Sequence, residues 1–170
     1  MSPRRPSFTG VFGLSRRDFL RAAALWCVSH RTWAESPKLP LARALRDELT
    51  LALKRANPLV VLVSLEGCPF CKVTREHYLV PLREQIGLHV VQVDMNSDAA
   101  LQIFDGTVTT HAQQVRSWGI KLAPTVLFFG HSGAEVAPRL EGAGAADFYG
   151  AYLDARLERA RDAIRHKSNR

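Results

Sequence analysis

The chain has 170 residues, of which 46% are apolar and 23% are charged, an ordinary composition for a globular domain that excludes collagen-like and low-complexity chains. A domain of this length buries enough surface to fold without disulfide or metal staples. The net charge of +7 is concentrated: residues 1–34 hold six arginines and one aspartate, whereas residues 35–170 hold 17 basic and 15 acidic side chains, which argues against a nucleic-acid-binding domain.

Residues 1–34 show the successive features of an export signal. Ser15-Arg16-Arg17-Asp18-Phe19-Leu20 matches the twin-arginine pattern, an apolar stretch follows at 22–29, and Thr32-Trp33-Ala34 offers the small residues of a cleavage site. The apolar stretch is too short for a membrane span, which needs about 20 residues. We predict a cleaved twin-arginine signal peptide at 1–34, a mature domain at 35–170 without stable membrane insertion, and a periplasmic location. The alternative is a basic tail that matches by chance.

Eight helices and strands are predicted in the mature chain from apolar periodicity and from Gly and Pro punctuation. In chain order they are a helix at 41–56, a strand at 59–65, a helix from Pro69 to about Leu79 with a further turn to Ile86, a strand at 88–95, a helix at 111–118, strands at 125–129 and 134–140, and a helix at 145–165. Pro81 is predicted to end or kink the second helix near residue 80, and Gly87 to stop it. This order predicts an α/β fold with a mixed central sheet flanked by helices.

Two regions carry more specific predictions. The polar segment 96–110 contains Asp105-Gly106 and is predicted to be an irregular insertion with a short helix at 99–104. The strand at 134–140 is predicted to form a hairpin with the strand before it. In the closing helix, the residues expected near one apolar face are Phe148, Tyr152, Ala155 and Leu157.

Cys68-Pro69-Phe70-Cys71 lies between the predicted buried strand and the start of a helix. The spacing places Cys68 at the helix N-terminus, where unpaired N–H groups and the helix dipole favour a thiolate, and Cys71 one turn inside, where it is more shielded. Both are predicted to be catalytic: Cys68 attacks a substrate disulfide and Cys71 resolves the mixed disulfide. Pro69 and Phe70 are predicted to contact the substrate and to tune the reduction potential.

Three other interpretations of the cysteines are open. A structural disulfide is disfavoured because a four-residue loop gains little chain entropy, and a chance pair is disfavoured by the helix-start context. A metal site would need more ligands than two cysteines, and His77, His89 and His111 are scattered. No metal and no cofactor are therefore predicted. The remaining alternative function is a copper-binding or partner-binding protein without turnover.

The strand at 59–65, the Cys-Pro-Phe-Cys motif, and Ala123-Pro124-Thr125 before the next apolar strand together resemble the thioredoxin superfamily across about residues 41–160. The resemblance implies a thioredoxin-like fold with a mixed four-stranded sheet. It also implies a cis Pro124 that faces the dithiol, and it implies that Ala123 pairs with the substrate through its backbone.

A finer resemblance is to bacterial periplasmic thioredoxin-related proteins of the SoxW type, carried by Glu66 to Lys72 and by the long segment around Asp105-Gly106. It implies an exported thiol–disulfide oxidoreductase of the protein-disulfide reductase type. The implied partners are a disulfide-containing protein substrate and a membrane electron donor such as a DsbD-type reductase, with no nucleic acid.

The sequence departs from thioredoxin at several positions. Gly67 stands where thioredoxin has a Trp, and Leu62 stands where it has a buried acid that relays protons. Glu66 is the nearest substitute for that acid, although an exposed turn carboxylate is its more ordinary interpretation. Ala123 is smaller than the usual residue before the proline, and we expect it to widen the substrate groove. No glutathione site is predicted.

Overall fold

The computed structural model describes residues 38–143 and 146–168. The predicted signal peptide, its cleavage site and Cys27 lie outside these residues. The elements are, in order, α1 (Leu45–Leu53), β1 (Leu59–Ser64), α2 (Pro69–Val73), a π-helical segment (Thr74–Leu79), α3 (Val80–Ile86), β2 (Val90–Asp94), β3 (Ala100–Gln102), β4 (Val108–Thr110), α4 (His111–Ser117), β5 (Thr125–Phe129), a 3₁₀ turn (His131–Gly133), β6 (Leu140–Glu141) and α5 (Ala146–Ser168).

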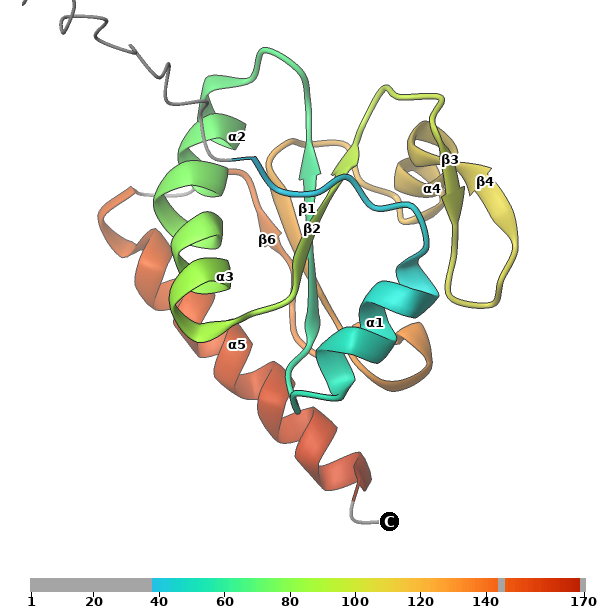
Figure 1. Ribbon diagram of the computed structural model, residues 1–170. Coiled ribbons are helices and arrows are strands. Elements are labelled where there is room, and N and C mark those ends of the chain that lie inside the picture. Colours follow the sequence, from blue (N-terminus) through green and yellow to red (C-terminus); the bar gives the residue numbers. More distant parts are fainter. Residues whose placement is uncertain (1–37, 144–145, 169–170) are drawn as a thin grey trace, which may run out of the picture. The chain divides into compact units, whose positions relative to one another are not determined.

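The predicted mixed four-stranded sheet is confirmed, with the strand order β2-β1-β5-β6. β1 pairs in parallel with β2 and antiparallel with β5, and β5 pairs antiparallel with β6. Every residue of β1 and β5 is buried, as expected for continuous apolar strands covered on both faces. In Figure 1, α2, α3 and α5 lie on one side of this sheet, and α1, α4 and the β3–β4 hairpin lie on the other.

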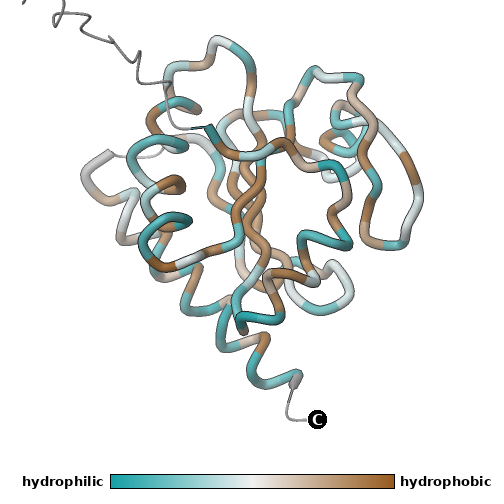
Figure 2. Tube along the Cα trace, in the orientation of Figure 1, coloured by the Kyte–Doolittle hydropathy of each residue, from teal (hydrophilic) through white to brown (hydrophobic). Residues whose placement is uncertain are grey.

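The two faces of the sheet hold separate hydrophobic cores. Val60 and Leu62 of β1 belong to the core that also contains residues of α3 and α5, whereas Val61 and Val63 belong to the core that contains residues of α1 and α4. This alternation follows from the two-residue period of a strand. The central strands form the most hydrophobic part of the chain in Figure 2. Among the described residues, no helix is both long and apolar enough to cross a membrane.

The second helix continues past Pro81 to Ile86. Within the π-helical segment the hydrogen bonds lengthen by one residue, so that the Val80 N–H donates to the Arg75 carbonyl. Pro81 has no N–H to donate, and the change of hydrogen-bond spacing just before it accommodates the proline. Pro81 therefore marks a change of helix type near residue 80 and does not end the helix. Gly87 stops the helix with a φ of +64°, as predicted.

Two predicted boundaries were wrong because sheet pairing overrides local helical spacing. The first helix begins at Leu45 and not at Leu41: Leu41 and Ala44 form β-bridges to Gln92 and Gln102, and the Ala42 N–H donates to the Gln92 carbonyl of β2 at 2.8 Å. The helix predicted at 99–104 is absent. The β3–β4 hairpin stands there instead, and β3 is also bridged to Ala44.

The closing hairpin and helix also differ from prediction. The partner of β5 is antiparallel, as predicted, but β6 covers only Leu140–Glu141, because Pro138 has no N–H to offer a ladder. In α5 the buried face is formed by Tyr149, Leu153, Leu157, Ala160 and Ile164. Of the residues expected on that face only Leu157 is buried, since Phe148, Tyr152 and Ala155 are exposed.

Candidate active site: a cysteine pair at a strand–helix junction

The end of β1 and the start of α2 hold the cysteine pair. Gly67 takes a φ of +72° in the turn after β1, a conformation that glycine adopts at little cost. The Cys68 N–H donates to the Leu65 carbonyl at 3.2 Å and closes the turn. Cys68 is the N-cap of α2, and Pro69 occupies the first helical turn, where its missing N–H costs nothing.

Cys68 and Cys71 form a disulfide with their Cα atoms 5.3 Å apart. Cys68 is half-buried, whereas Cys71 is only 1% exposed, as the sequence predicted. The Cys71 N–H donates to Cys68 Sγ at 3.1 Å. The more accessible sulfur is therefore also the one that a backbone N–H stabilises, which suits Cys68 for nucleophilic attack and Cys71 for resolution.

The predicted proline faces this pair. The Ala123–Pro124 peptide bond is cis, and the Ala123 carbonyl oxygen lies 3.9 Å from Cys68 Sγ. Pro124 is buried at the start of β5, where the Thr125 hydroxyl donates to the Leu122 carbonyl at 2.7 Å. The fold thus brings Cys68, Cys71 and the Ala123–Pro124 segment together, although they are far apart in the sequence.

Exposed apolar side chains lie beside these groups in the chain. Phe70 is 63% exposed and Leu122 is 52% exposed, and Pro69 is exposed as well. A contiguous patch of such side chains marks an interaction surface, whereas single ones are normal. Their placement is compatible with the substrate contacts predicted for Pro69 and Phe70, and those roles stay predictions.

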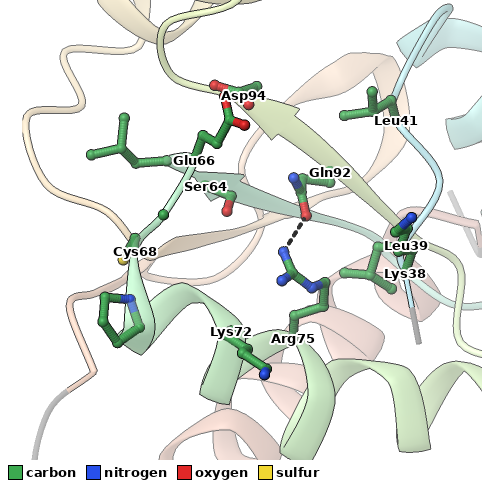
Figure 3. A pocket seen from close by; sticks show the side chains of 13 residues that line it. Lys38, Leu39, Leu41, Ser64, Glu66, Cys68, Lys72, Arg75, Gln92 and Asp94 are labelled. Atoms are coloured by element: carbon green, nitrogen blue, oxygen red, sulfur yellow. Dashed lines mark hydrogen bonds between the residues drawn. The ribbon is translucent and has the colours of Figure 1, made fainter. Parts of the chain in front are cut away.

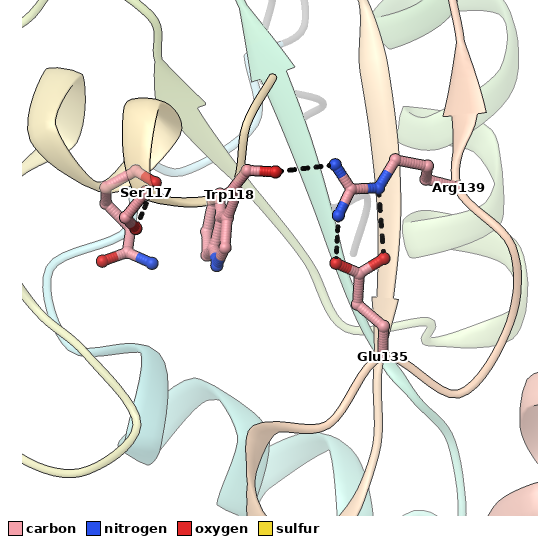
Figure 4. A network of polar contacts seen from close by, with 5 residues as sticks. Ser117, Trp118, Glu135 and Arg139 are labelled. Atoms are coloured by element: carbon pink, nitrogen blue, oxygen red, sulfur yellow. Dashed lines mark hydrogen bonds and ion pairs between the residues drawn. The ribbon is translucent and has the colours of Figure 1, made fainter.

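A polar network braces the segment that leads to Pro124. Arg139 donates from Nη1 to the Trp118 carbonyl at 3.0 Å and forms an ion pair with Glu135 through Nε and Nη2. Figure 4 shows the guanidinium between that carbonyl and the carboxylate, and Ser117 with its own hydroxyl bond nearby. Trp118 caps α4, so Arg139 ties the start of the 119–124 segment to the hairpin that follows β5.

A pocket that was not predicted adjoins Cys68, and its lining combines charged side chains with a larger apolar area. It has a volume of about 690 Å³, and its lining includes Cys68 with the charged or polar residues Lys38, Glu66, Lys72, Arg75, Gln92 and Asp94. Figure 3 shows Cys68 at one end and Lys38 to Leu41 at the other. One sequence signal was available: Lys72 and Arg75 lie four and seven residues after Cys68, the spacing of one helix face.

The positions considered for a proton relay have different surroundings. Leu62 is completely buried in the core on the α3 and α5 side of the sheet, and Glu66 is exposed in the turn before Cys68. Glu66 therefore has the surroundings of an ordinary turn carboxylate. Within the described part of the chain, no three His, Cys, Asp or Glu side chains are grouped so that they could hold a metal ion.

Comparison with known proteins agrees with this architecture. A sequence model of the thioredoxin-like domain family matches residues 45–157. Three solved structures that are similar to this chain are thioredoxins. They are mitochondrial thioredoxin 3 of Saccharomyces cerevisiae (16% identity, 71% of this chain and 93% of that chain covered, TM-score 0.48), a Fasciola hepatica thioredoxin (18%, 72% and 99%, 0.49) and a poplar thioredoxin h (18%, 67% and 95%, 0.47).

No curated protein sequence matches the chain, and the finer resemblance to the SoxW type stays a prediction. The family match spans most of the chain, and the sheet order, the cysteine pair and the cis proline occur within the matched residues. The chain therefore belongs to the thioredoxin-like domain family.

Proposed function

We propose that the protein is a thiol–disulfide oxidoreductase that cycles Cys68 and Cys71 between the dithiol and the disulfide. The observation that carries this proposal is the asymmetry of the pair. A half-buried Cys68 that accepts a backbone N–H lies beside the cis Ala123–Pro124 segment, while its partner Cys71 is buried.

The reaction follows from that asymmetry. In the reductive direction the Cys68 thiolate attacks one sulfur of a substrate disulfide, forms a mixed disulfide and releases the first substrate thiolate. Cys71 then loses its proton and attacks Cys68 Sγ, which releases the second substrate thiolate and leaves the Cys68–Cys71 disulfide. Two electrons pass from the cysteine pair to the substrate. Ala123 would align an extended substrate segment through its backbone, and Pro69 and Phe70 would contact it.

Insulin reduction with dithiothreitol as the electron source tests the proposal. The unaltered chain should accelerate insulin precipitation, and Cys68→Ser should abolish the acceleration. Cys71→Ser, reduced beforehand and then freed of dithiothreitol, should form a mixed disulfide with insulin that mass spectrometry detects. A copper titration of the reduced chain belongs to the same experiment. Stoichiometric copper binding without any insulin turnover would overturn the proposal in favour of a metal-binding protein.

We further propose that the protein is exported by the twin-arginine route and works in the periplasm as a protein-disulfide reductase. Support comes from the residue pattern in 1–34 and from the resemblance to SoxW-type proteins. A reductase in an oxidising compartment needs an electron source, for which a membrane donor of the DsbD type is suited. Its substrate would be a disulfide-containing protein.

Two measurements test these finer proposals. Mass analysis of the protein from its native cell should find a chain that begins near Glu35, and an intact Met1 in a cytoplasmic fraction would refute export. The reduction potential of the cysteine pair separates a reductase from an oxidant, because the pair must be more reducing than its substrate to donate electrons. A strongly oxidising potential would refute the reductase assignment.

A further inference from the structure

The pocket beside Cys68 has dimensions suited to a small molecule. Its volume of about 690 Å³ falls in the range of roughly 300 to 1,000 Å³ found for small-ligand sites. Ser64 and Asp94, from the carboxyl ends of the parallel strands β1 and β2, are among the lining residues. Ligands in open α/β sheets bind outside this end of the strands. The pocket therefore places a small-molecule site next to the proposed nucleophile.

Opposite charges line separate sides of this pocket. In Figure 3 the side chains of Glu66 and Asp94 lie together on one side, and Arg75 lies on the other side with Lys72. A ligand that carried only one sign of charge would meet repulsion on one side. A ligand that carried a carboxylate and an ammonium group would be complementary to both sides.

Arg75 has donors to spare for a carboxylate. Nη1 donates to Gln92 Oε1 at 3.1 Å, and Nε is buried without a hydrogen-bond partner among the described residues. A guanidinium has five N–H donors and pairs with carboxylates in a fork geometry. The hydrogen bond to Gln92 uses only one of the five donors. The Arg75 guanidinium can therefore bind a ligand carboxylate.

We infer that this pocket binds the amino-acid head of a small disulfide, with the carboxylate at Arg75, the ammonium group at Glu66 and Asp94, and the disulfide directed at Cys68. The inference rests on the proposed function and names a substrate class for it. Cys68 and Cys71 supply two electrons and two protons, and the ligand R–S–S–R leaves as two R–SH molecules.

Four small disulfides that differ in charge test the inference on the unaltered chain. They are cystine, with both charges, dithiodipropionate, with carboxylates only, cystamine, with ammonium groups only, and bis(2-hydroxyethyl) disulfide, which is neutral. The rate constant of each with the reduced protein is divided by its rate constant with free dithiothreitol, so that intrinsic reactivity cancels. We expect the corrected rate for cystine to exceed that for the neutral disulfide by about tenfold, the factor that 1.4 kcal/mol of recognition produces.

Two substitutions separate the two sides of the pocket. Arg75→Met should slow cystine and dithiodipropionate several-fold but should not slow cystamine, which the Arg75 cation repels. Glu66→Gln should slow cystine and cystamine but should not slow dithiodipropionate, which the Glu66 carboxylate repels. Arg75→Lys should restore part of the rate because it keeps the charge, and Arg116→Met, which removes an exposed arginine outside the pocket lining, is the matched control.

The possible outcomes test the pocket assignment and the proposed oxidoreductase function separately. Equal corrected rates for cystine and the neutral disulfide, or equal effects of Arg75→Met and Arg116→Met, would overturn the pocket assignment while the oxidoreductase stands. Failure of the unaltered chain to react with insulin and with all four small disulfides would overturn the proposed function, and the inference with it.

Discussion

Arg139 offers a direct test of whether the segment before the cis proline must be held in place. Arg139→Met keeps most of the aliphatic stem but removes the hydrogen bond to the Trp118 carbonyl and the ion pair with Glu135. Trp118, at the start of the segment 119–124, would then lose its hydrogen bond to the loop between β5 and β6. We expect a lower free energy of unfolding and slower reduction of protein disulfides.

The expected loss of stability in Arg139→Met follows from how exposed the Arg139–Glu135 ion pair is. The side chains of Arg139 and Glu135 are 25% and 30% exposed, so the ion pair itself contributes at most about 1 kcal/mol. The hydrogen bond from a charged group to the Trp118 carbonyl contributes about 1.5 kcal/mol, the lower end for such bonds. Arg139→Met should therefore cost about 2 kcal/mol in total, whereas Glu135→Gln, which keeps the bond to Trp118, should cost less than about 1 kcal/mol.

Urea unfolding of both variants and of the double variant measures the two contributions separately in a double-mutant cycle. Insulin reduction by Arg139→Met should fall several-fold, while its rate with the neutral bis(2-hydroxyethyl) disulfide should stay near that of the unaltered chain, because a small substrate makes little use of the Ala123 backbone. An unfolding free energy within about 0.5 kcal/mol of the unaltered protein would refute the brace, since substitutions away from structural features have effects of that size. An equal fall of both rates would refute its role in substrate alignment.

Three further substitutions probe the fold around the site. His111 is buried, accepts the Asp94 N–H of β2 at Nδ1 and contacts the Ala42 carbonyl through Nε2. His111→Leu should therefore lower the free energy of unfolding by about 2 to 4 kcal/mol. An unchanged urea midpoint would contradict this prediction. Gly133 has a φ of +72°, and an added Cβ would lie 2.3 Å from Phe104 Cγ, so Gly133→Ala should destabilise by about 2 kcal/mol or more. Gly119→Ala is its control, because Gly119 has a similar φ and open space, and equal losses in the two variants would disprove the clash. Burial raises the pKa of Tyr149 above its usual value of 10.0. The unfolded chain therefore loses the Tyr149 proton first as the pH rises above 10.0, and the free energy of unfolding falls in that range. Tyr149→Phe should make the thermal midpoint fall less steeply at alkaline pH. A midpoint that falls equally steeply in the variant and the unaltered chain would contradict this prediction.

The centre of the fold could be predicted because its signals are local. β1 and β5 are continuous apolar runs of strand length bounded by Gly and Pro, a pattern typical of strands that are buried on both faces. The turn at Gly67 and the helix start at Pro69 are equally local, so the cysteine pair was placed correctly at the junction. The mixed sheet then followed from the order of the elements.

The periphery depends on contacts between distant residues, which local patterns do not contain. β3 lies in a segment too polar to suggest a strand, and it is held by Ala44 and by the packing of Phe104 against Phe129. In α5, apolar side chains occur on more than one face, so spacing alone did not identify the buried one. Tyr149 is buried because it packs on Tyr78, with ring centroids 4.8 Å apart.

The pocket was missed for the same reason. Arg75 and Gln92 lie on different elements, and neither belongs to a recognisable motif. Only the packing of the second helix against β2 brings them within 3.1 Å of each other. The two cysteines lie within one helical turn and could be predicted from the sequence. Arg75 and Gln92 come together only in the folded chain, so the sequence did not predict their contact.

The burial of Leu62 bears on how the proposed catalytic cycle handles its protons. Cys71 must lose a proton before it attacks Cys68, yet it is 1% exposed and the leucine at the family's acid position has no acceptor for that proton. The substrate sulfur leaves Cys68 as the bond between Cys71 and Cys68 forms, and it needs a proton at the same moment. A transfer from Cys71 to the departing thiolate, directly or through one water molecule, satisfies both groups without an acidic side chain. The rate at which Cys71 resolves the mixed disulfide would then depend on the basicity of the leaving thiolate more than on the protonation of a carboxylate in the protein.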